Sequence, residues 1–136
     1  MDYFAYKNNK LYCEDVDLQD IAMQYGTPCY VYSKKTLERH VEVYKNAFKT
    51  KDNLICFSVK SLSNISILEL INKKGCGFDV VSGGELRRAL HVGADPKKII
   101  FSGVGKSYEE ILLGVQNDIL SFNIESEAEV YRIEEI

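Results

Sequence analysis

The sequence predicts an α/β fold in which parallel strands alternate with helices. Strand-like runs are found near residues 54–59, 78–81, 98–102 and 119–123. Helical patterns follow them near residues 64–73, 84–92, 108–116 and 127–135. Alternating elements of this length indicate βαβ units and a parallel sheet. Four such units amount to about half of an eight-stranded β/α barrel, which takes about 250 residues when complete.

At 136 residues the chain is too short to close such a barrel. Half a barrel would leave two sheet edges unpaired, and unpaired edges invite association. We therefore expect the chain to be the first half of the barrel of a longer protein, in preference to one that a partner completes. An open, doubly wound sheet is the alternative fold, because four βα units do not by themselves show closure.

The chain divides into residues 1–32, which predict a β-rich leader, and residues 33–136, which predict the half barrel. Within the leader, the pattern indicates a short helix over residues 18–25. Cys29–Tyr32 is predicted to be a strand that the chain enters through Pro28.

The sequence predicts which face of one helix is buried and where several helices begin and end. A helix over residues 34–48 is predicted to bury an apolar stripe made of Leu37, Val41, Tyr44 and Phe48. Three later helices begin with S-x-x-E, the signature of a capping box, at Ser82/Glu85, Ser107/Glu110 and Ser126/Glu129. Gly75 and Gly93 are placed to end helices in a left-handed conformation.

Composition excludes several classes of function. A net charge of −3 argues against nucleic acid and anionic membranes as partners. No apolar run approaches the ~20 residues that cross a bilayer, and no signal peptide is found at the start. The chain has two histidines and four cysteines without a C-x-x-C pair, so zinc spacing is absent. Cys56 and Cys76 are expected to be buried free thiols, which suits the reducing cytoplasm.

The strand near residues 54–59 is predicted to end on Lys60. Alternation places Ile55, Phe57 and Val59 on one side and Cys56, Ser58 and Lys60 on the other. The carboxyl end of a barrel strand is where catalytic side chains lie. A desolvated amine at that place can attack a carbonyl carbon and form a Schiff base. The alternative interpretation of Lys60 is a solvated strand end.

Five segments carry a resemblance to a known family, in the order that the family uses. They are Gly26–Ser33 (GTPCYVYS), Phe57–Asn64 (FSVKSLSN), Gly75–Leu86 (GCGFDVVSGGEL), Ile100–Ser107 (IFSGVGKS) and Phe122–Ser126 (FNIES). Together they resemble the decarboxylases of the alanine-racemase-like family, which depend on pyridoxal 5'-phosphate (PLP). Within that family the chain is more similar to the diaminopimelate decarboxylases than to their ornithine- or arginine-cleaving relatives. The segments Gly26-Thr27-Pro28 and Gly103–Ser107 (GVGKS) favour the diaminopimelate decarboxylases.

The resemblance implies a PLP-binding (β/α)8 barrel of the TIM type, with Lys60 as the catalytic residue that carries PLP. The implied reaction is loss of carbon dioxide from meso-diaminopimelate, a small amino acid, to give L-lysine in lysine biosynthesis. It also implies that residues 1–32 join a second β-domain and that the complete enzyme is a homodimer. The family's glycine-rich phosphate loop and a cysteine from the partner subunit are not in this chain, so we expect the 136 residues alone to be inactive.

Three further residues are predicted to bind the cofactor, namely Asp79, Ser82 and Glu85. In the family the residue that matches Asp79 lies at the cofactor site, and the one that matches Glu85 lies near it. Hydrogen bonds inside the barrel would also explain Asp79, and helix capping would explain Ser82 and Glu85. Gly83 and Gly84 fit either a close approach to a ligand or a simple tight turn.

Other patterns leave rival functions to weigh. Where relatives commonly carry Asn two residues after the lysine, this chain has Leu62, which gives some weight to a non-catalytic PLP-binding module. A decarboxylase of another basic amino acid or polyamine precursor is the other alternative. Gly103–Ser107 suggests a nucleotide-binding P-loop, but Ile100 stands where that motif needs its first glycine. The glutamates of the last helical region are predicted to form a solvated face: Glu125, Glu127, Glu129, Glu134 and Glu135.

Overall fold

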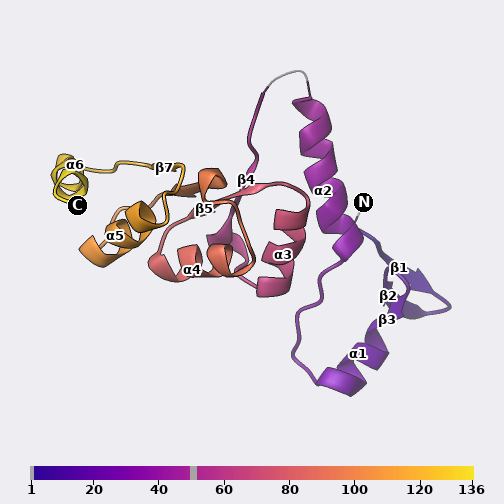
Figure 1. Ribbon diagram of the computed structural model, residues 1–136. Helices are drawn as coiled ribbons and strands as arrows, with labels where there is room; N and C mark the ends of the chain where they lie inside the picture. Colours follow the sequence, from indigo (N-terminus) through magenta and orange to yellow (C-terminus); the bar gives the residue numbers. More distant parts are fainter. Residues whose placement is uncertain (1, 50–51) are drawn as a thin grey trace. The chain divides into compact units, whose positions relative to one another are not determined.

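The computed structural model describes residues 2–49 and 52–136. The chain folds as two compact units, Met1–Ala47 and Phe48–Ile136. The first unit contains an antiparallel sheet and two helices, and the second contains a parallel sheet with its helices (Figure 1).

The first unit begins with a three-stranded antiparallel meander. Its strands are β1 (Phe4–Lys7), β2 (Lys10–Cys13) and β3 (Val16–Asp17), and the helices α1 (Leu18–Tyr25) and α2 (Lys34–Ala47) follow. Asn8 and Asn9 form the β1–β2 turn with φ of 50° and 63°, a conformation that asparagine tolerates better than most residues. Asp17 caps α1 by accepting a hydrogen bond from the Gln19 amide at 2.8 Å. The predicted β-rich leader and its short helix are therefore confirmed.

Two predictions for the first unit are wrong. Cys29–Tyr32 forms no strand, because no described segment pairs with it, and Tyr30 is 90% exposed. An isolated extended segment cannot satisfy its backbone groups as a ladder does. The helix predicted over residues 34–48 is present as α2, but none of its residues is buried. Of its predicted apolar stripe, Leu37 and Val41 are half-buried, whereas Tyr44 and Phe48 are exposed.

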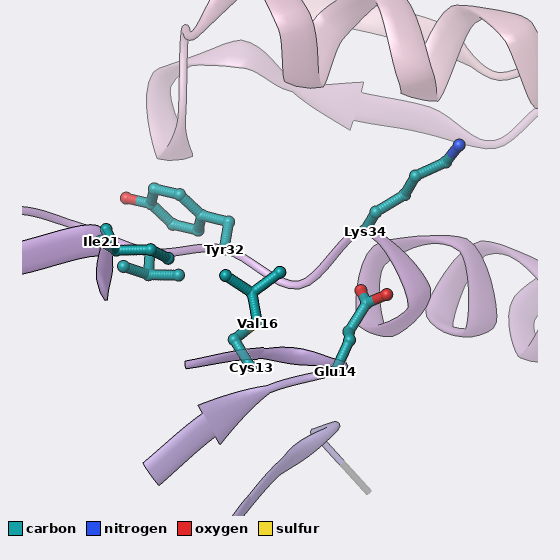
Figure 2. A pocket seen from close by; sticks show the side chains of 7 residues that line it. Cys13, Glu14, Val16, Ile21, Tyr32 and Lys34 are labelled. Atoms are coloured by element: carbon teal, nitrogen blue, oxygen red, sulfur yellow. The ribbon is translucent and has the colours of Figure 1, made fainter. Parts of the chain in front are cut away.

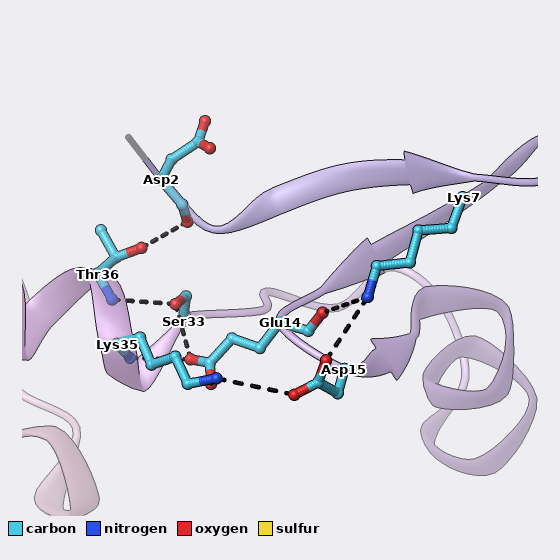
Figure 3. A network of polar contacts seen from close by, with 7 residues as sticks. All are labelled: Asp2, Lys7, Glu14, Asp15, Ser33, Lys35 and Thr36. Atoms are coloured by element: carbon cyan, nitrogen blue, oxygen red, sulfur yellow. Dashed lines mark hydrogen bonds and ion pairs between the residues drawn. The ribbon is translucent and has the colours of Figure 1, made fainter.

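A polar network fixes the start of α2 (Figure 3). Ser33 Oγ accepts a hydrogen bond from the Thr36 amide at 3.0 Å and donates one to Glu14 Oε1 at 2.8 Å. The same carboxylate oxygen accepts a hydrogen bond from the Lys35 amide at 2.8 Å. The Lys35 amide and the Ser33 hydroxyl lower the pKa of Glu14. A carboxylate from the β2–β3 turn thus occupies the positive end of α2.

The second unit is built on four parallel strands that lie side by side in chain order. They are β4 (Cys56–Ser58), β5 (Gly77–Val80), β6 (Ile99–Phe101) and β7 (Ser121–Phe122). Their helices are α3 (Ile65–Lys73), α4 (Gly83–His91), α5 (Tyr108–Gln116) and α6 (Glu127–Glu134). Helix α4 contacts both α3 and α5, so these three form one layer (Figure 1). A strand order that never reverses is that of a β/α barrel and differs from a doubly wound sheet.

The two faces of this sheet differ in burial. Phe78, Ile99 and Phe101 are fully buried on the face that α3, α4 and α5 cover. Each of these three helices contributes a large, fully buried side chain to this core: Leu68, Leu86 and Ile111. Burial of such a side chain stabilises the fold by roughly 1.5–3 kcal/mol. The opposite face, which includes Ser58 and Asp79, is only half-buried, as expected for the interior of half a barrel.

The lysine strand is shorter than predicted. β4 ends at Ser58, and Val59–Ser61 forms a 3-10 turn, so Lys60 is not a strand residue. Ser61 Oγ donates a hydrogen bond to Ser58 O at 2.7 Å, and the Leu62 amide donates to Val59 O at 3.0 Å. These local bonds replace the sheet ladder.

The predicted capping boxes are only partly right. Ser107 and Glu110 form a complete box at the start of α5. Ser82 accepts from the Glu85 amide at 3.2 Å, but Glu85 Oε2 accepts from the Val81 amide, one residue before the cap. The Ser126 side chain makes no capping bond. Glu129 Oε2 accepts from the Glu125 amide at 3.0 Å, one residue before the cap, as Glu85 does.

Glycines are required at two kinds of position in the second unit. Gly75 and Gly93 have φ of 77° where α3 and α4 end, as predicted. Gly77 is needed for a different reason, because a Cβ atom there would lie 2.1 Å from the carbonyl oxygen of Lys98. This close approach lets β5 pack against the segment that leads into β6.

Glu110 joins the N-termini of two neighbouring helices. Its Oε1 accepts a hydrogen bond from the Gly83 amide at 2.7 Å, and its Oε2 accepts one from the Ser107 amide at 3.0 Å. The Gly83 amide, followed by the Ser107 amide, lowers the pKa of Glu110. Because the folded-state pKa is depressed, this stabilisation is present above the ordinary glutamate pKa of about 4.3 and is lost as the pH falls through the folded-state value.

We therefore expect Glu110→Gln to lower the free energy of unfolding at pH 7 by about 1–3 kcal/mol. Glutamine keeps one acceptor oxygen, but its NH2 group would face the second backbone amide. The difference from wild type should narrow below about pH 4.3, where Glu110 of the unfolded chain becomes protonated, and should be lost as the pH falls through the lower folded-state pKa. Denaturant unfolding at pH 7 and at lower pH measures both effects. The exposed Glu109→Gln in the same helical turn is the control, and an equal loss in that variant would contradict the account.

Candidate active site

Several polar residues of the second unit lie at the carboxyl edge of the parallel sheet. In a β/α barrel this edge is the catalytic face. Asp79 is the one charged residue within β4, β5, β6 and β7. The turn that contains Lys60 follows β4 directly, so both residues belong to this part of the sheet.

Lys60 presents a free amine. The residue is exposed, and no described residue forms a hydrogen bond or an ion pair with its ammonium group. The 3-10 turn that follows β4 fixes its backbone. A primary amine that no carboxylate holds is available to a carbonyl compound. Because Lys60 is exposed, the desolvation expected from the sequence is not found among the described residues, and its role as the cofactor lysine stays a prediction.

Asp79 is held by hydroxyl groups from both neighbouring strands. It lies in register with Ser58 of β4, whose Oγ donates a hydrogen bond to Asp79 Oδ2 at 3.2 Å. Ser102, directly after β6, donates its hydroxyl to Asp79 Oδ1. Asn123 Nδ2 in turn donates to Ser102 Oγ at 2.9 Å. The half-buried carboxylate is therefore partnered, as its polar nature requires.

Sequence reasoning did not identify Ser102 or Asn123 as part of this network. A signal was present, since each residue is the polar last residue of a run predicted to be a strand, 98–102 and 119–123. The ends of parallel strands meet at one edge, so polar residues at these positions come together.

Ser82 and Glu85 shape the turn between β5 and α4. The Ser82 hydroxyl caps α4, and the Glu85 carboxylate holds the Val81 amide at 2.8 Å. Gly83 is buried, and its amide already donates to Glu110. The backbone amide of Gly83 is therefore not free for a ligand, and the tight-turn interpretation of this position fits the structure.

The lysine of the GVGKS segment is buried. Lys106 Nζ lies 3.0 Å from Glu129 Oε1, and the two side chains are 0% and 5% exposed. The same ammonium donates hydrogen bonds to Gly103 O and Asn123 O, both at 2.8 Å. Lys106 therefore cannot bind a phosphate as a P-loop lysine does. The prediction that Glu129 lies on a solvated face is wrong, because its charge is needed to neutralise Lys106.

The Cys56 thiol near the site is not activated. Burial, and then the charges of Asp79 and Cys76, raise the pKa of the Cys56 thiol. A thiol with a raised pKa is a poor nucleophile at neutral pH. Cys76 is buried as predicted, whereas Cys56 is half-buried, and both are free thiols.

The first unit contains a separate small cavity of about 190 Å³ (Figure 2). Its lining is mainly apolar and comprises Cys13, Glu14, Val16, Ile21, Val31, Tyr32 and Lys34. In Figure 2 the Lys34 ammonium points away from the other labelled side chains. Burial raises the pKa of the Cys13 thiol, so this thiol is not an activated group.

No helix within the described residues has the length and apolar character to cross a membrane.

Comparisons with known proteins agree with this geometry. The family described as pyridoxal-dependent decarboxylase, pyridoxal binding domain, matches residues 34–136. The diaminopimelate decarboxylase of Haemophilus influenzae is 52% identical to this chain over 136 residues, which cover all of this chain and 33% of that protein.

Solved structures show the same fold. Diaminopimelate decarboxylase from M. jannaschii, in complex with L-lysine, is 35% identical with a TM-score of 0.95 and covers 98% of this chain and 32% of its own. Ornithine decarboxylase from Entamoeba histolytica is 28% identical with a TM-score of 0.68 and covers 75% of this chain and 30% of its own.

The chain thus spans about a third of the length of the relatives that it matches. The predicted α/β fold, a partial PLP-binding barrel with a short β-rich leader, is confirmed by the parallel sheet, by the antiparallel meander and by these neighbours. The match to the family extends over the whole second unit, including Lys60 and Asp79. The chain therefore belongs to the pyridoxal-dependent decarboxylases, and residues 34–136 correspond to their pyridoxal-binding domain.

Proposed function

We propose that this chain is the N-terminal, cofactor-lysine-bearing part of a diaminopimelate decarboxylase, which converts meso-diaminopimelate into L-lysine and carbon dioxide. The observation that carries the proposal is the exposed and unpartnered Lys60 at the carboxyl edge of a barrel sheet. The diaminopimelate decarboxylases named above also match the chain at higher identity and over more of its length than the ornithine decarboxylase does.

The residues at this edge fit PLP. Its aldehyde needs a primary amine without an ion-pair partner, and Lys60 supplies one. When bound, PLP withdraws the electron pair that carbon dioxide leaves behind. Lys60 Nζ would hold the aldehyde carbon with loss of water and so keep the cofactor at the sheet edge.

We propose that Asp79 provides the charged contact at the cofactor site. Its carboxylate lies on the open face of the sheet. Asp79 is in register with Ser58, which lies two positions before Lys60. Each carboxylate oxygen accepts one hydroxyl hydrogen bond and can accept another. Ser82 and Glu85 contribute through the β5–α4 turn, whose backbone they hold in place beside the cofactor.

The decisive test is a substrate panel on the complete protein that carries this chain. With PLP present, we expect release of carbon dioxide and formation of lysine from meso-diaminopimelate. Turnover of ornithine, arginine or carboxynorspermidine should be much slower. Preference for one of these would replace the proposed substrate, and PLP binding without turnover of any would favour the non-catalytic module. The chain alone, which lacks two thirds of its relatives' length, should produce no lysine.

Two finer proposals concern the setting of the enzyme. The homodimer that the family resemblance implies stays a prediction, which light scattering on the complete protein would test. We also propose a cytoplasmic location, for which the four free cysteines provide support. Fractionation of cells that express the complete protein would test the location.

A further inference from the structure

A continuous chain of hydrogen bonds crosses the open face of the parallel sheet. Ser58 and Ser102 each donate a hydroxyl hydrogen bond to Asp79, and Asn123 donates to Ser102. The four residues come from four neighbouring strand ends. Ser58 closes β4, Asp79 lies in β5, and Ser102 and Asn123 directly follow β6 and β7.

The direction of these bonds follows from Asp79, because a carboxylate can only accept hydrogen bonds. A serine hydroxyl has a single proton to donate. The Ser102 proton is therefore directed toward Asp79 Oδ1, and Ser102 Oγ accepts the side-chain amide of Asn123 at 2.9 Å. Asn123 thus holds the Ser102 hydroxyl in the orientation in which it donates to the carboxylate, which Ser58 holds from the other side.

The backbone of Asn123 is itself fixed by buried groups. Its amide donates to Phe101 O at 2.9 Å, and its carbonyl oxygen accepts a hydrogen bond from Lys106 Nζ at 2.8 Å. Glu129 neutralises Lys106 in the core. Because its backbone is fixed, the side-chain amide of Asn123 occupies a defined place, although the residue is exposed.

We propose that Ser102 and Asn123 are positioning residues, which hold the carboxylate of Asp79 in one orientation at the cofactor site. The inference rests on the proposed function, because that proposal assigns Asp79 to the cofactor. Without the Ser102 hydroxyl, the carboxylate keeps one of its two side-chain partners and can turn about its Cβ–Cγ bond. A misplacement of about 1 Å at a reacting centre can lower a rate by about 100-fold.

The test uses the complete holoenzyme with Ser102→Ala, Asn123→Ala and Ser102→Thr. Threonine keeps the hydroxyl that alanine removes. Ser121→Ala is the matched control, since Ser121 is an exposed serine in β7, in register with Ile100 on the same sheet. Three quantities are measured: the absorbance band of bound PLP, the rate at which borohydride fixes a pyridoxyl group on Lys60, and kcat with KM.

Ser102→Ala and Asn123→Ala should shift the absorbance band and lower kcat by about 10-fold or more, whereas KM changes less. Ser102→Thr and Ser121→Ala should behave as wild type. The inference is overturned if both alanine variants keep the wild-type band, trapping rate and kcat. It is also overturned if Ser102→Thr is as defective as Ser102→Ala and both melt at a lower temperature. Failure of the proposed function is a different result. In that case the wild-type enzyme itself gives no pyridoxyl group on Lys60, or forms no L-lysine from meso-diaminopimelate.

Discussion

Lys60→Ala is expected to remove covalent retention of PLP and to lower kcat of the complete enzyme by about 1,000-fold or more, the scale of losing a reacting group. Alanine has no amine to bind the aldehyde carbon. Because Lys60 is exposed and makes no side-chain bond to a described residue, the melting temperature of the apoprotein should stay within about one degree of wild type. Steady-state kinetics, dialysis of the PLP-loaded protein and thermal unfolding measure the three effects.

Lys60→Arg separates charge from nucleophilicity in the same experiment. Arginine keeps a positive charge at this place but cannot supply a free amine at neutral pH. We expect it to be as inactive as the alanine variant. Lys97→Ala, another exposed lysine of the second unit, should keep full activity. An active Lys60→Arg enzyme would show that Lys60 acts only through its charge, and the assignment of the cofactor lysine would then be wrong.

Among the single variants proposed above and below, Lys106→Met is expected to lose the most stability, about 3–5 kcal/mol in the free energy of unfolding. Methionine fills the volume but leaves the Glu129 carboxylate charged in the core. It also removes the donor from the carbonyl oxygens of Gly103 and Asn123. Denaturant unfolding of the variant and of wild type measures this loss.

The exposed pair Lys97–Asp118 provides the matched comparison. Lys97→Met should cost at most about 1 kcal/mol, the usual value for a surface ion pair. The double variant Lys106→Met/Glu129→Leu removes both buried charges and should lose less stability than the sum of its two single variants, because no unpaired charge is left. Strict additivity would show that Lys106 and Glu129 do not depend on each other.

Local signals in the sequence predicted most of the second unit. The run 108–116 shows the reason, since Ser107 and Glu110 both mark the start of α5 and its apolar residues repeat at helical spacing. Gly75 and Gly93 likewise ended their helices where the pattern placed them. In these places a few neighbouring residues determine the conformation, so the sequence alone is sufficient.

Features that depend on distant residues could not be predicted in the same way. Cys29–Tyr32 has the composition of a strand, but a strand also needs a partner. Glu129 has the spacing of a capping residue on a charged helix, but a buried lysine 23 positions earlier determines its place. The polar ends of two predicted strands were visible at Ser102 and Asn123, but the bonds that join them to Asp79 depend on the register of neighbouring strands, which only the folded sheet shows.

The most direct test of the central claim is to map the site at which PLP binds. The complete protein is incubated with PLP and reduced with borohydride, and the modified peptide is identified by mass spectrometry, with Lys60→Ala treated in parallel. The account predicts one pyridoxyl group per chain, located on Lys60 and absent from the variant. A group on another lysine, or the same yield from Lys60→Ala, would contradict the claim that this chain carries the cofactor lysine.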